Sequence, residues 1–187
     1  MKTIVIGGVA GGASTAARLR RMDEKAEIII LERGPYISFA NCGLPYFIGE
    51  VISERDKLLV VTPEMLREMM NIDSRVLNEV IAIDRKKKSV TVRNLETGET
   101  YEETYDKLVL SPGAGPIVPP LPGVDLPGVF TLRNLPDMDK IKAFVDEKKP
   151  ARAVVVGGGF IGLEIAENLV DRGVEVTLIE MLDQVMA

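Results

Sequence analysis

Residues 3–12 read Thr-Ile-Val-Ile-Gly-Gly-Val-Ala-Gly-Gly. A short apolar run followed at once by glycines predicts a buried strand, a tight turn and the start of a helix. Small residues continue to Met22, and the apolar run Glu27-Ile-Ile-Ile-Leu-Glu follows. A strand at 3–7, a helix at 12–22 and a strand at 27–32 would form a βαβ unit of a dinucleotide-binding α/β fold.

A second glycine signature stands at residues 157–162, Gly-Gly-Gly-Phe-Ile-Gly. It predicts a tight turn at Gly157, close approach of a pyrophosphate at Gly159 and packing of a helix against a strand at Gly162. Glu180 suits a ribose hydroxyl and would repel a 2′-phosphate, so NADH is favoured over NADPH. The elements expected around this signature are a strand at 152–156, a helix at 160–172 and a strand at 175–180.

The first signature is less regular, because Val9 stands where the middle glycine is expected and crowds a phosphate. Gly11 relieves this crowding locally, and the helix that begins at Gly12 presents free amides to an anion. Glu32 lies 20 residues beyond Gly12, at the end of the next strand. We therefore expect both signatures to bind nucleotides.

Between the signatures the pattern changes. Thr62-Pro63-Glu64 predicts the start of a short helix over residues 63–70. Residues 76–110 predict a three-stranded β-meander whose last strand is Tyr105–Leu110, with turns at Arg85–Lys88 and Thr97-Gly98. Seven of the eleven prolines lie from Pro112 to Pro136, which marks a crossover between two domains.

In the second domain, Asp137 is expected to cap a helix that carries Ile141, Phe144 and Val145 on one face. Gly173 suits the end of the last helix. A doubly wound domain needs more strands than follow that helix, so we expect the second domain to be incomplete in this chain.

Composition excludes several classes of function. The net charge of -5 provides no electrostatic footprint for nucleic acid, and no apolar run is long enough for a membrane span. The N-terminus from Lys2 resembles a signal peptide weakly, but four glycines interrupt its apolar stretch. A single cysteine forms no internal disulfide, which favours a reducing cytoplasm, and the absence of histidine leaves no zinc site and no His-based triad.

The single cysteine, Cys42, lies in the run 38–46, Ser-Phe-Ala-Asn-Cys-Gly-Leu-Pro-Tyr. A free cysteine is most often a small buried apolar residue. Here Asn41 suits a helix cap and Pro45 suits a first helical turn, so Cys42 is expected at a helix N-terminus that favours the thiolate. One reactive thiol between two dinucleotide sites suggests a two-electron path from a nicotinamide through a flavin to sulfur.

On these residues the chain resembles the pyridine nucleotide-disulfide oxidoreductases, and within them the single-cysteine branch of coenzyme A-disulfide reductases and related NADH oxidases. The resemblance covers essentially the whole chain, and Val9 is typical of that branch. The segments that carry it are Ile6–Gly12, Ser38–Pro45, Tyr105–Gly113 and the second glycine signature.

The resemblance implies a Rossmann-like FAD-binding domain over residues 1–118, with the β-meander, followed by an incomplete NAD(P)-binding Rossmann domain over residues 119–187. It also implies that Cys42 faces the flavin. Phe47 stands where two-cysteine reductases carry their second cysteine, so Cys42 would cycle through a mixed disulfide or a sulfenic acid. Ala10 stands where related peroxidases carry a histidine, which favours disulfide chemistry.

Ser14, Arg18 and Arg21 fall at i, i+4 and i+7 of the first helix, and the resemblance implies that they hold coenzyme A phosphates. The alternative is a solvated helix face. Ser38 and Asn41 are expected near the substrate, Val80 against the adenine. The residues that the resemblance and the signatures assign to FAD or NADH are Gly7, Val9, Ala10, Gly11, Gly12, Glu32, Arg33, Asn41, Val80, Ser111, Pro112, Gly113, Gly157, Gly159, Phe160, Ile161, Gly162, Glu164 and Glu180.

Three hypotheses of function follow. In the first, electrons from NADH pass through FAD to Cys42, which reduces coenzyme A disulfide or another small disulfide or persulfide, in a full-length homodimer. In the second, the protein is an NADH oxidase in which Cys42 passes through sulfenate. In the third, these residues are a non-catalytic nucleotide-binding fragment, because the family's later flavin motif and dimerisation domain are not among them.

Overall fold

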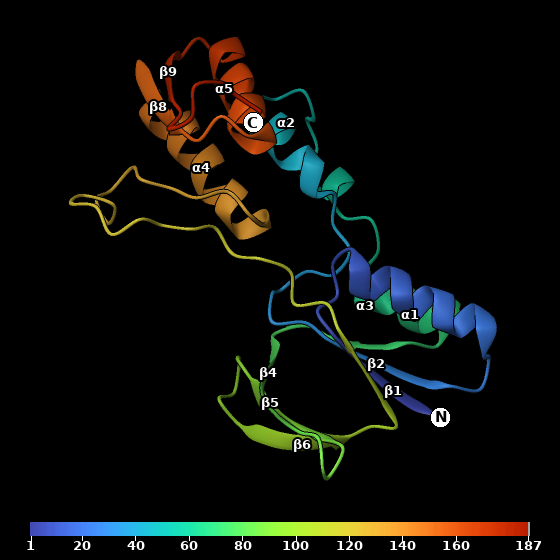
Figure 1. The fold of residues 1–187 in the computed structure, drawn as a ribbon. Helices are drawn as coiled ribbons and strands as arrows, with labels where there is room; N and C mark the ends of the chain where they lie inside the picture. The colour runs from blue at the N-terminus through green and yellow to red at the C-terminus, as the bar shows by residue number, and fades with distance from the viewer. Residues whose placement is uncertain (187) are drawn as a thin grey trace. The chain divides into compact units, whose positions relative to one another are not determined.

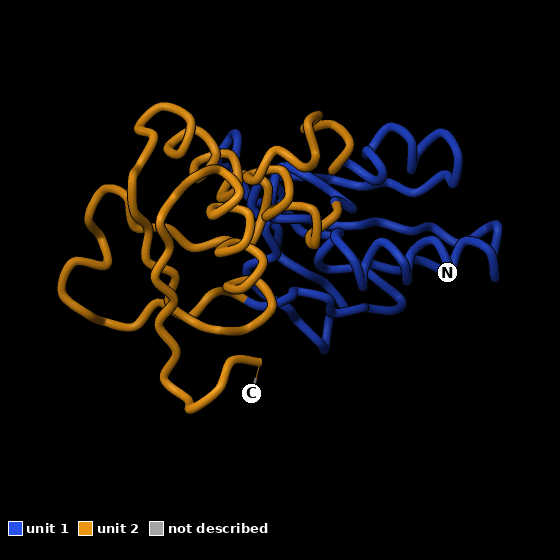
Figure 2. The backbone as a smooth tube through the Cα atoms, turned by 90° about the horizontal axis from the view of Figure 1, so that it is seen from above, with its two compact units in different colours: residues 1–39, 59–114 blue, residues 40–58, 115–187 orange. Residues whose placement is uncertain are grey.

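The computed structural model describes residues 1–186, and the chain divides into two compact units. Unit 1 consists of residues 1–39 and 59–114, and unit 2 of residues 40–58 together with residues from 115 onward (Figure 2). The second break lies close to the domain boundary expected at residue 118. The assignment of residues 40–58 to unit 2 differs from the sequence-based division, which placed them in the first domain.

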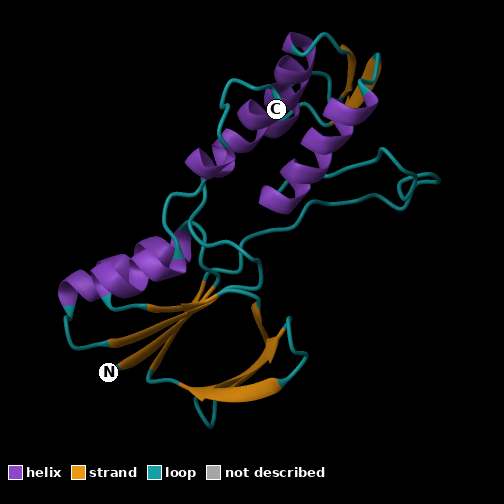
Figure 3. Ribbon diagram, turned by 180° about the vertical axis from the view of Figure 1, so that it is seen from behind, coloured by secondary structure: helices purple, strands orange, loops and turns teal. Residues whose placement is uncertain are grey.

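Within residues 1–186, unit 1 contains a parallel sheet of four strands in the order β3-β2-β1-β7 (Figure 3). Helix α1 (Gly11–Met22) connects β1 to β2, as expected for a βαβ unit. Helix α3 (Pro63–Met70) begins at Thr62, whose hydroxyl accepts a hydrogen bond from the Met65 N–H. The strands are β1 (Lys2–Ile6), β2 (Glu27–Leu31), β3 (Asp73–Arg75) and β7 (Lys107–Leu110).

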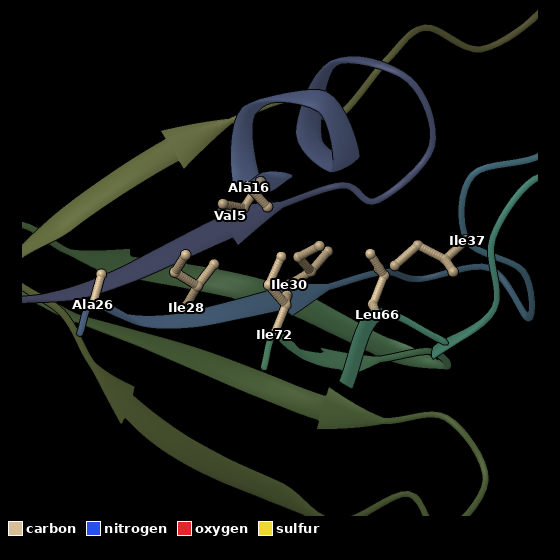
Figure 4. Close-up of a cluster of buried hydrophobic side chains, with 8 residues drawn as sticks. All are labelled: Val5, Ala16, Ala26, Ile28, Ile30, Ile37, Leu66 and Ile72. Atoms are coloured by element: carbon tan, nitrogen blue, oxygen red, sulfur yellow. The ribbon is translucent and has the colours of Figure 1, made fainter. Parts of the chain in front are cut away.

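Apolar side chains alternate between the two faces of this sheet, since successive strand residues point in opposite directions. On one face, Ile28 and Ile30 pack with Ala16 of α1 and Leu66 of α3 (Figure 4). On the other face, Ile4, Ile29 and Leu31 pack against Val90 and Val92. The sheet is therefore buried on both sides, which is the usual condition of a parallel sheet.

The second face is covered by an antiparallel β-meander of β4 (Asn78–Asp84), β5 (Ser89–Asn94) and β6 (Thr100–Thr104). The prediction that Tyr105–Leu110 forms the last strand of the meander was wrong. Residues 107–110 instead form β7 and pair with β1 in the parallel sheet. The apolar residues Leu108, Val109 and Leu110 suit that sheet, because strands of a parallel sheet carry continuous apolar runs without alternation.

A polar network joins the parallel sheet to the meander. Arg75 of β3 donates hydrogen bonds to Asp73, to Glu103 of β6 at 2.8 Å and to the hydroxyl of Tyr101. Lys2 of β1 also donates to Glu103 at 2.5 Å. Burial by itself raises the pKa of Glu103, but the hydrogen bonds from Lys2 and Arg75 outweigh it and leave the pKa below its ordinary value of 4.5.

Replacing Glu103 by glutamine is expected to lower the free energy of unfolding at pH 7 by about 2 kcal/mol, because two charged donors lose a carboxylate partner. A folded-state pKa below the unfolded value stabilises the fold above the unfolded pKa, and this contribution is lost as pH falls through the folded one. The difference between variant and wild type should therefore shrink below pH 4.5. Urea unfolding of both proteins at pH 7 and at about pH 3.5 would measure the two differences. If wild type and variant differed in free energy of unfolding by the same amount at both pH values, the assigned role of the Glu103 carboxylate would be contradicted.

Arg20 ties the end of α1 to the end of α3. Its guanidinium donates hydrogen bonds to main-chain carbonyl oxygens at the ends of both helices. The acceptors are the carbonyl oxygens of Asp23, Glu24, Ala26, Met70 and Asn71.

Unit 2 contains the second βαβ arrangement at the expected place. In the described part of the chain its sheet consists of β8 (Arg152–Val156) and β9 (Glu175–Ile179), which are parallel and connected by α5 (Phe160–Asp171). Gly173 ends the helix with a φ of 79° and donates to the Val170 carbonyl, which confirms its expected role. The other elements of unit 2 are η1 (Asn41–Gly43), α2 (Leu44–Ile48), η2 (Arg55–Leu58) and α4 (Leu135–Lys148).

The cap of α4 differs from the expectation. Asn134, not Asp137, is the N-cap residue, and its side chain accepts a hydrogen bond from the Asp137 N–H at 3.0 Å. Asp137 lies in the first turn, where its carboxylate accepts from the Arg133 N–H at 3.1 Å. The two side chains thus satisfy amides of the same helix start reciprocally. None of the helices within residues 1–186 has the length and apolar character that crossing a membrane requires.

Candidate functional site

The first glycine turn, between β1 and α1, is closed by two glycines. Gly7 has a φ of 91°, and a side chain there would overlap the carbonyl oxygen of Ser111. A side chain on Gly12 would overlap the carbonyl oxygen of Gly7. These glycines are required by the packing of the backbone itself, since a Cβ has no space at either position.

The residues between them begin α1. Ala10 is the N-cap residue and makes no side-chain capping hydrogen bond, so the first amides of the helix remain available to an anion. Val9 is half-buried and Ala10 and Gly11 are exposed. Ser111, at the end of β7, faces Gly11, with its hydroxyl 3.5 Å from an ideal Cβ placed there. The structure thus brings the first signature and Ser111 together.

Glu32, at the end of β2, is held by the same turn. One carboxylate oxygen accepts a hydrogen bond from the Gly8 N–H at 2.7 Å, and the other accepts from the Gly34 N–H at 2.6 Å. A carboxylate has further lone pairs, so a ribose hydroxyl can still be accommodated. The sequence indicated Glu32 as a cofactor-binding residue but not that it fixes the glycine turn.

Of the other residues of unit 1 expected in this site, Ser38 bonds the glycine turn, Arg33 lies near Glu79 of the meander, and Val80 lies in the meander. Ser38 donates its N–H to the Gly8 carbonyl and has a φ of 48°, a left-handed conformation uncommon for serine. Arg33 is exposed and lies 3.9 Å from Glu79. Val80 packs against the core between sheet and meander, beside a register shift in β4.

Pro112 and Gly113 follow Ser111 directly, and both are exposed. Gly113 has a φ of 68°, which favours glycine. The residues that follow Ser111 are therefore exposed where the chain leaves β7 beside the first glycine turn.

Ser14, Arg18 and Arg21 lie on the exposed face of α1. Within residues 1–186, the side chains of Arg18 and Arg21 make no hydrogen bond or ion pair, in contrast to Arg20. The structure thus confirms that these three residues share one solvent-facing stripe and leaves their expected phosphate contacts a prediction.

The second glycine turn, between β8 and α5, repeats the first. Gly157 has a φ of 105°, and a side chain on Gly162 would overlap the Gly157 carbonyl oxygen. An ideal Cβ at Gly159 meets no described atom within 4 Å, so glycine there leaves open space in front of the helix. That space is what the expected approach of a pyrophosphate requires.

Glu180, after β9, is bound by its own turn in the manner of Glu32. It accepts hydrogen bonds from the N–H groups of Gly158 at 2.6 Å, Met181 at 2.7 Å and Leu182 at 2.9 Å. The bonds from Leu182 and Gly158 hold the pKa of Glu180 below its usual range. Each βαβ unit therefore ends in a carboxylate that holds the second glycine of its turn.

Phe160, Ile161 and Glu164 form the first turns of α5. Phe160 and Ile161 are exposed to 72% and 57%, which is high for apolar side chains of this size. Glu164 is half-buried, and its carbonyl accepts a hydrogen bond from Asn168. This end of α5 therefore presents an apolar surface next to the second glycine turn.

Cys42 is exposed and lies in η1, immediately before α2. Pro45 is in the first turn of α2 as expected, but Asn41 is not its cap, because the N-cap residue is Gly43 and no side chain caps the helix. Helix α2 has only five residues, so its dipole is weaker than the sequence suggested. Cys42 belongs to unit 2, and the first glycine turn, where the flavin nucleotide is expected, belongs to unit 1. That Cys42 faces the flavin therefore stays a prediction.

Sequence reasoning missed the residues that hold α2 in unit 2. Asn168 of α5 and Arg172, the C-cap residue of α5, contact Gly49 and Ile48 at the end of α2. A signal was present, since the polar residues Glu164, Asn168 and Arg172 follow one another at intervals of four. Over residues 1–186 no group of three or more His, Cys, Asp or Glu side chains is arranged to hold a metal ion.

Comparison with known proteins extends these observations. The chain is 48% identical over 184 residues to a coenzyme A disulfide reductase of Staphylococcus haemolyticus, covering 98% of this chain and 41% of that protein. It is similar to the crystal structure of reduced Bacillus anthracis CoADR-RHD, with a TM-score of 0.96 and 62% identity over 99% of this chain and 33% of the other. A NAD-dependent persulfide reductase from A. fulgidus has a TM-score of 0.94 and 40% identity over 99% of this chain and 34% of its own.

The chain thus spans less than half the length of the relatives that it matches. The family model described as pyridine nucleotide-disulphide oxidoreductase matches residues 1–187. With its two glycine turns, its parallel sheet and its exposed single cysteine, the chain belongs to the pyridine nucleotide-disulphide oxidoreductase family.

Proposed function

We propose that this chain is the nucleotide-binding and cysteine-carrying part of an NADH-dependent flavoprotein that reduces a small disulfide, with coenzyme A disulfide as the leading substrate. The observation that carries the proposal is the position of Cys42. Its side chain is exposed, and the helix that follows it packs on α5, which begins at the second glycine turn.

The two glycine turns fit the pyrophosphates of two dinucleotides. Unit 1 would hold FAD at Gly7–Gly12, Glu32 and Ser111, since these residues surround free helix amides. Unit 2 would hold NADH at Gly157–Gly162 and Glu180, where Gly159 leaves space for close approach. The carboxylate of Glu180 favours NADH, because a 2′-phosphate would meet its negative charge.

When bound, FAD accepts two electrons from NADH and passes them to sulfur. The Cys42 thiolate attacks one sulfur of the disulfide RSSR, so that a Cys42–S–SR bond forms and RS⁻ leaves. Two electrons then cleave that mixed disulfide into the Cys42 thiolate and a second RS⁻. NADH, one proton and RSSR thus yield NAD⁺ and two RSH. No second cysteine is needed, which fits the single cysteine of this chain.

Ser14, Arg18 and Arg21 support coenzyme A as the group R. Their exposed stripe presents two guanidinium groups without partners among residues 1–186. Arginine is suited to phosphate because its planar fork donates two parallel hydrogen bonds. The similarity to coenzyme A disulfide reductases supports the same assignment.

Replacing Arg18 and Arg21 together by alanine is expected to raise the KM for coenzyme A disulfide about tenfold or more, because two charge-assisted contacts are lost. The KM for a disulfide without phosphates should not change. Steady-state NADH oxidation with both substrates measures this, with the exposed Lys25→Ala as the matched control. An equal loss for both substrates would remove the stripe from the proposal.

A visible spectrum of the purified protein, taken before and after anaerobic NADH, tests the proposal. We expect flavin absorbance that NADH bleaches, and thiol release when a disulfide is added. Oxygen consumption without thiol release would favour the NADH oxidase that the sequence left open. A protein without flavin would indicate the non-catalytic fragment. For the whole protein, the family likeness supports a homodimer, and the lone cysteine supports a reducing cytoplasm.

A further inference from the structure

The C-terminal end of α2 packs against the side chain of Asn168 in α5. Asn168 is only 2% exposed, and an ideal Cβ at Gly49 would overlap its side-chain oxygen. Gly49 has a φ of -75°, so its backbone conformation would accept alanine. Glycine is required here by the proximity of Asn168 alone.

Charged side chains secure the same end of α2. Arg172, directly after α5, donates to the Ile48 carbonyl at 2.9 Å and to Asp146 of α4 at 2.8 Å. Lys142 of α4 lies 3.0 Å from Glu50, just beyond α2, and also bonds Asp146. Residues of α4 and of the end of α5 thus hold the end of α2, the helix that directly follows Cys42; Figure 1 shows the three helices.

Asn168 stabilises the fold less than an apolar residue of similar size would. Its amide nitrogen donates to the Glu164 carbonyl at 2.8 Å, but its buried Oδ1 accepts no hydrogen bond from residues 1–186. An unsatisfied buried carbonyl costs free energy that an apolar residue of similar size would avoid. Exchanging its oxygen and nitrogen would not help, because two carbonyl oxygens would then face each other.

We propose that Asn168 is a positioning residue. It holds Gly49 against α5 and thereby fixes α2, together with Cys42 immediately before it, to the helix that begins at the second nucleotide turn. The catalytic meaning of this role rests on the proposed function. Asn168 stands on the same face of α5 as Glu164 and Phe160, at intervals of four residues. One helix face therefore runs from the expected nicotinamide end to the support of Cys42.

The test uses three variants of the whole protein, in which the side chains at positions 49 and 168 are changed in size, singly and together. Gly49→Ala places a methyl group against Asn168, Asn168→Gly removes the side chain, and the double variant exchanges the two sizes. Hydrogen exchange should show protection of the Gly49, Glu50 and Ile52 amides falling about tenfold or more in Gly49→Ala, because their bonds to residues 45–47 depend on the seating of α2. The double variant should be better protected than either single variant. Glu167→Ala, on the exposed side of α5, should match wild type.

Alkylation of Cys42 at fixed pH and steady-state kinetics give the readout that a purely structural role would not move. We expect the alkylation rate in Gly49→Ala to differ from wild type, and kcat for disulfide reduction to fall about tenfold with the KM for NADH unchanged. The double variant should recover both quantities toward wild type.

Unchanged exchange and alkylation in Gly49→Ala, or a double variant no better than the worse single variant, would overturn the proposal. The exchange and alkylation arms need no flavin, NADH or turnover. A wild-type protein that reduces no disulfide would therefore sink the proposed function, while the support of α2 by Asn168 would still be decided by these two arms.

Discussion

Replacing Cys42 by serine is expected to lower the rate of disulfide reduction by about 10³-fold or more. A serine hydroxyl stays protonated at neutral pH and forms no mixed disulfide, so the step that cleaves RSSR is lost. The glycine turns that would hold both nucleotides contain no part of Cys42. NADH should therefore still bleach the flavin absorbance at close to the wild-type rate.

Two measurements separate these steps: rapid-mixing absorbance for the reaction with NADH, and titration of released thiol for turnover. Ser53→Ala is a suitable control, since Ser53 is an exposed residue of the same segment 40–58. Thiol release at the wild-type rate from the Cys42 variant would show that another group attacks the disulfide. Loss of the reaction with NADH would show instead that the substitution disturbs nucleotide binding.

Replacing Gly12 by alanine is expected to cost about 3 kcal/mol in the free energy of unfolding and to abolish flavin retention. Alanine ordinarily strengthens a helix, and Gly12 lies in α1. Here its methyl group would overlap the carbonyl oxygen of Gly7, which is main chain and cannot rotate away. Either the turn or the helix must move, and both form the expected phosphate site.

Gly11→Ala is the matched control for stability, because an ideal Cβ there lies 3.5 Å from its nearest neighbour, the Ser111 hydroxyl. It should fold at least as stably as wild type. Denaturant unfolding and the flavin content after gel filtration measure the two outcomes. If Gly12→Ala kept both wild-type stability and flavin, the close packing of α1 on the turn would not be what the glycine serves.

Local pattern was sufficient for the elements that nucleate each unit. The apolar runs that become β1, β2, β8 and β9, the glycine turns after β1 and β8, and the start of α3 at Thr62-Pro63 were all indicated at the right positions. Each depends on residues within a few positions of one another: apolar runs, glycine freedom and a fixed proline φ. The exposed stripe on α1 also follows from helical spacing alone.

The same local pattern failed where two partners competed for a segment. Residues 107–110 could extend the meander or join the parallel sheet. The choice depended on β1, which lies far earlier in the chain, since Thr3 of β1 pairs with Lys107. The start of α4 was placed at Asp137, because Asn134 and Asp137 are both good caps and only the fold shows which side chain bonds which amide.

By itself the sequence determined the parallel α/β class, the two glycine turns and the single thiol between them. The tertiary structure alone decided that Glu32 and Glu180 hold the second glycine of each turn, and that Asn168 and Arg172 hold the helix of Cys42. The physical reason is that glycine turns and apolar runs are specified by neighbouring residues, whereas these contacts join residues 22 to 124 positions apart that meet only after the chain has packed.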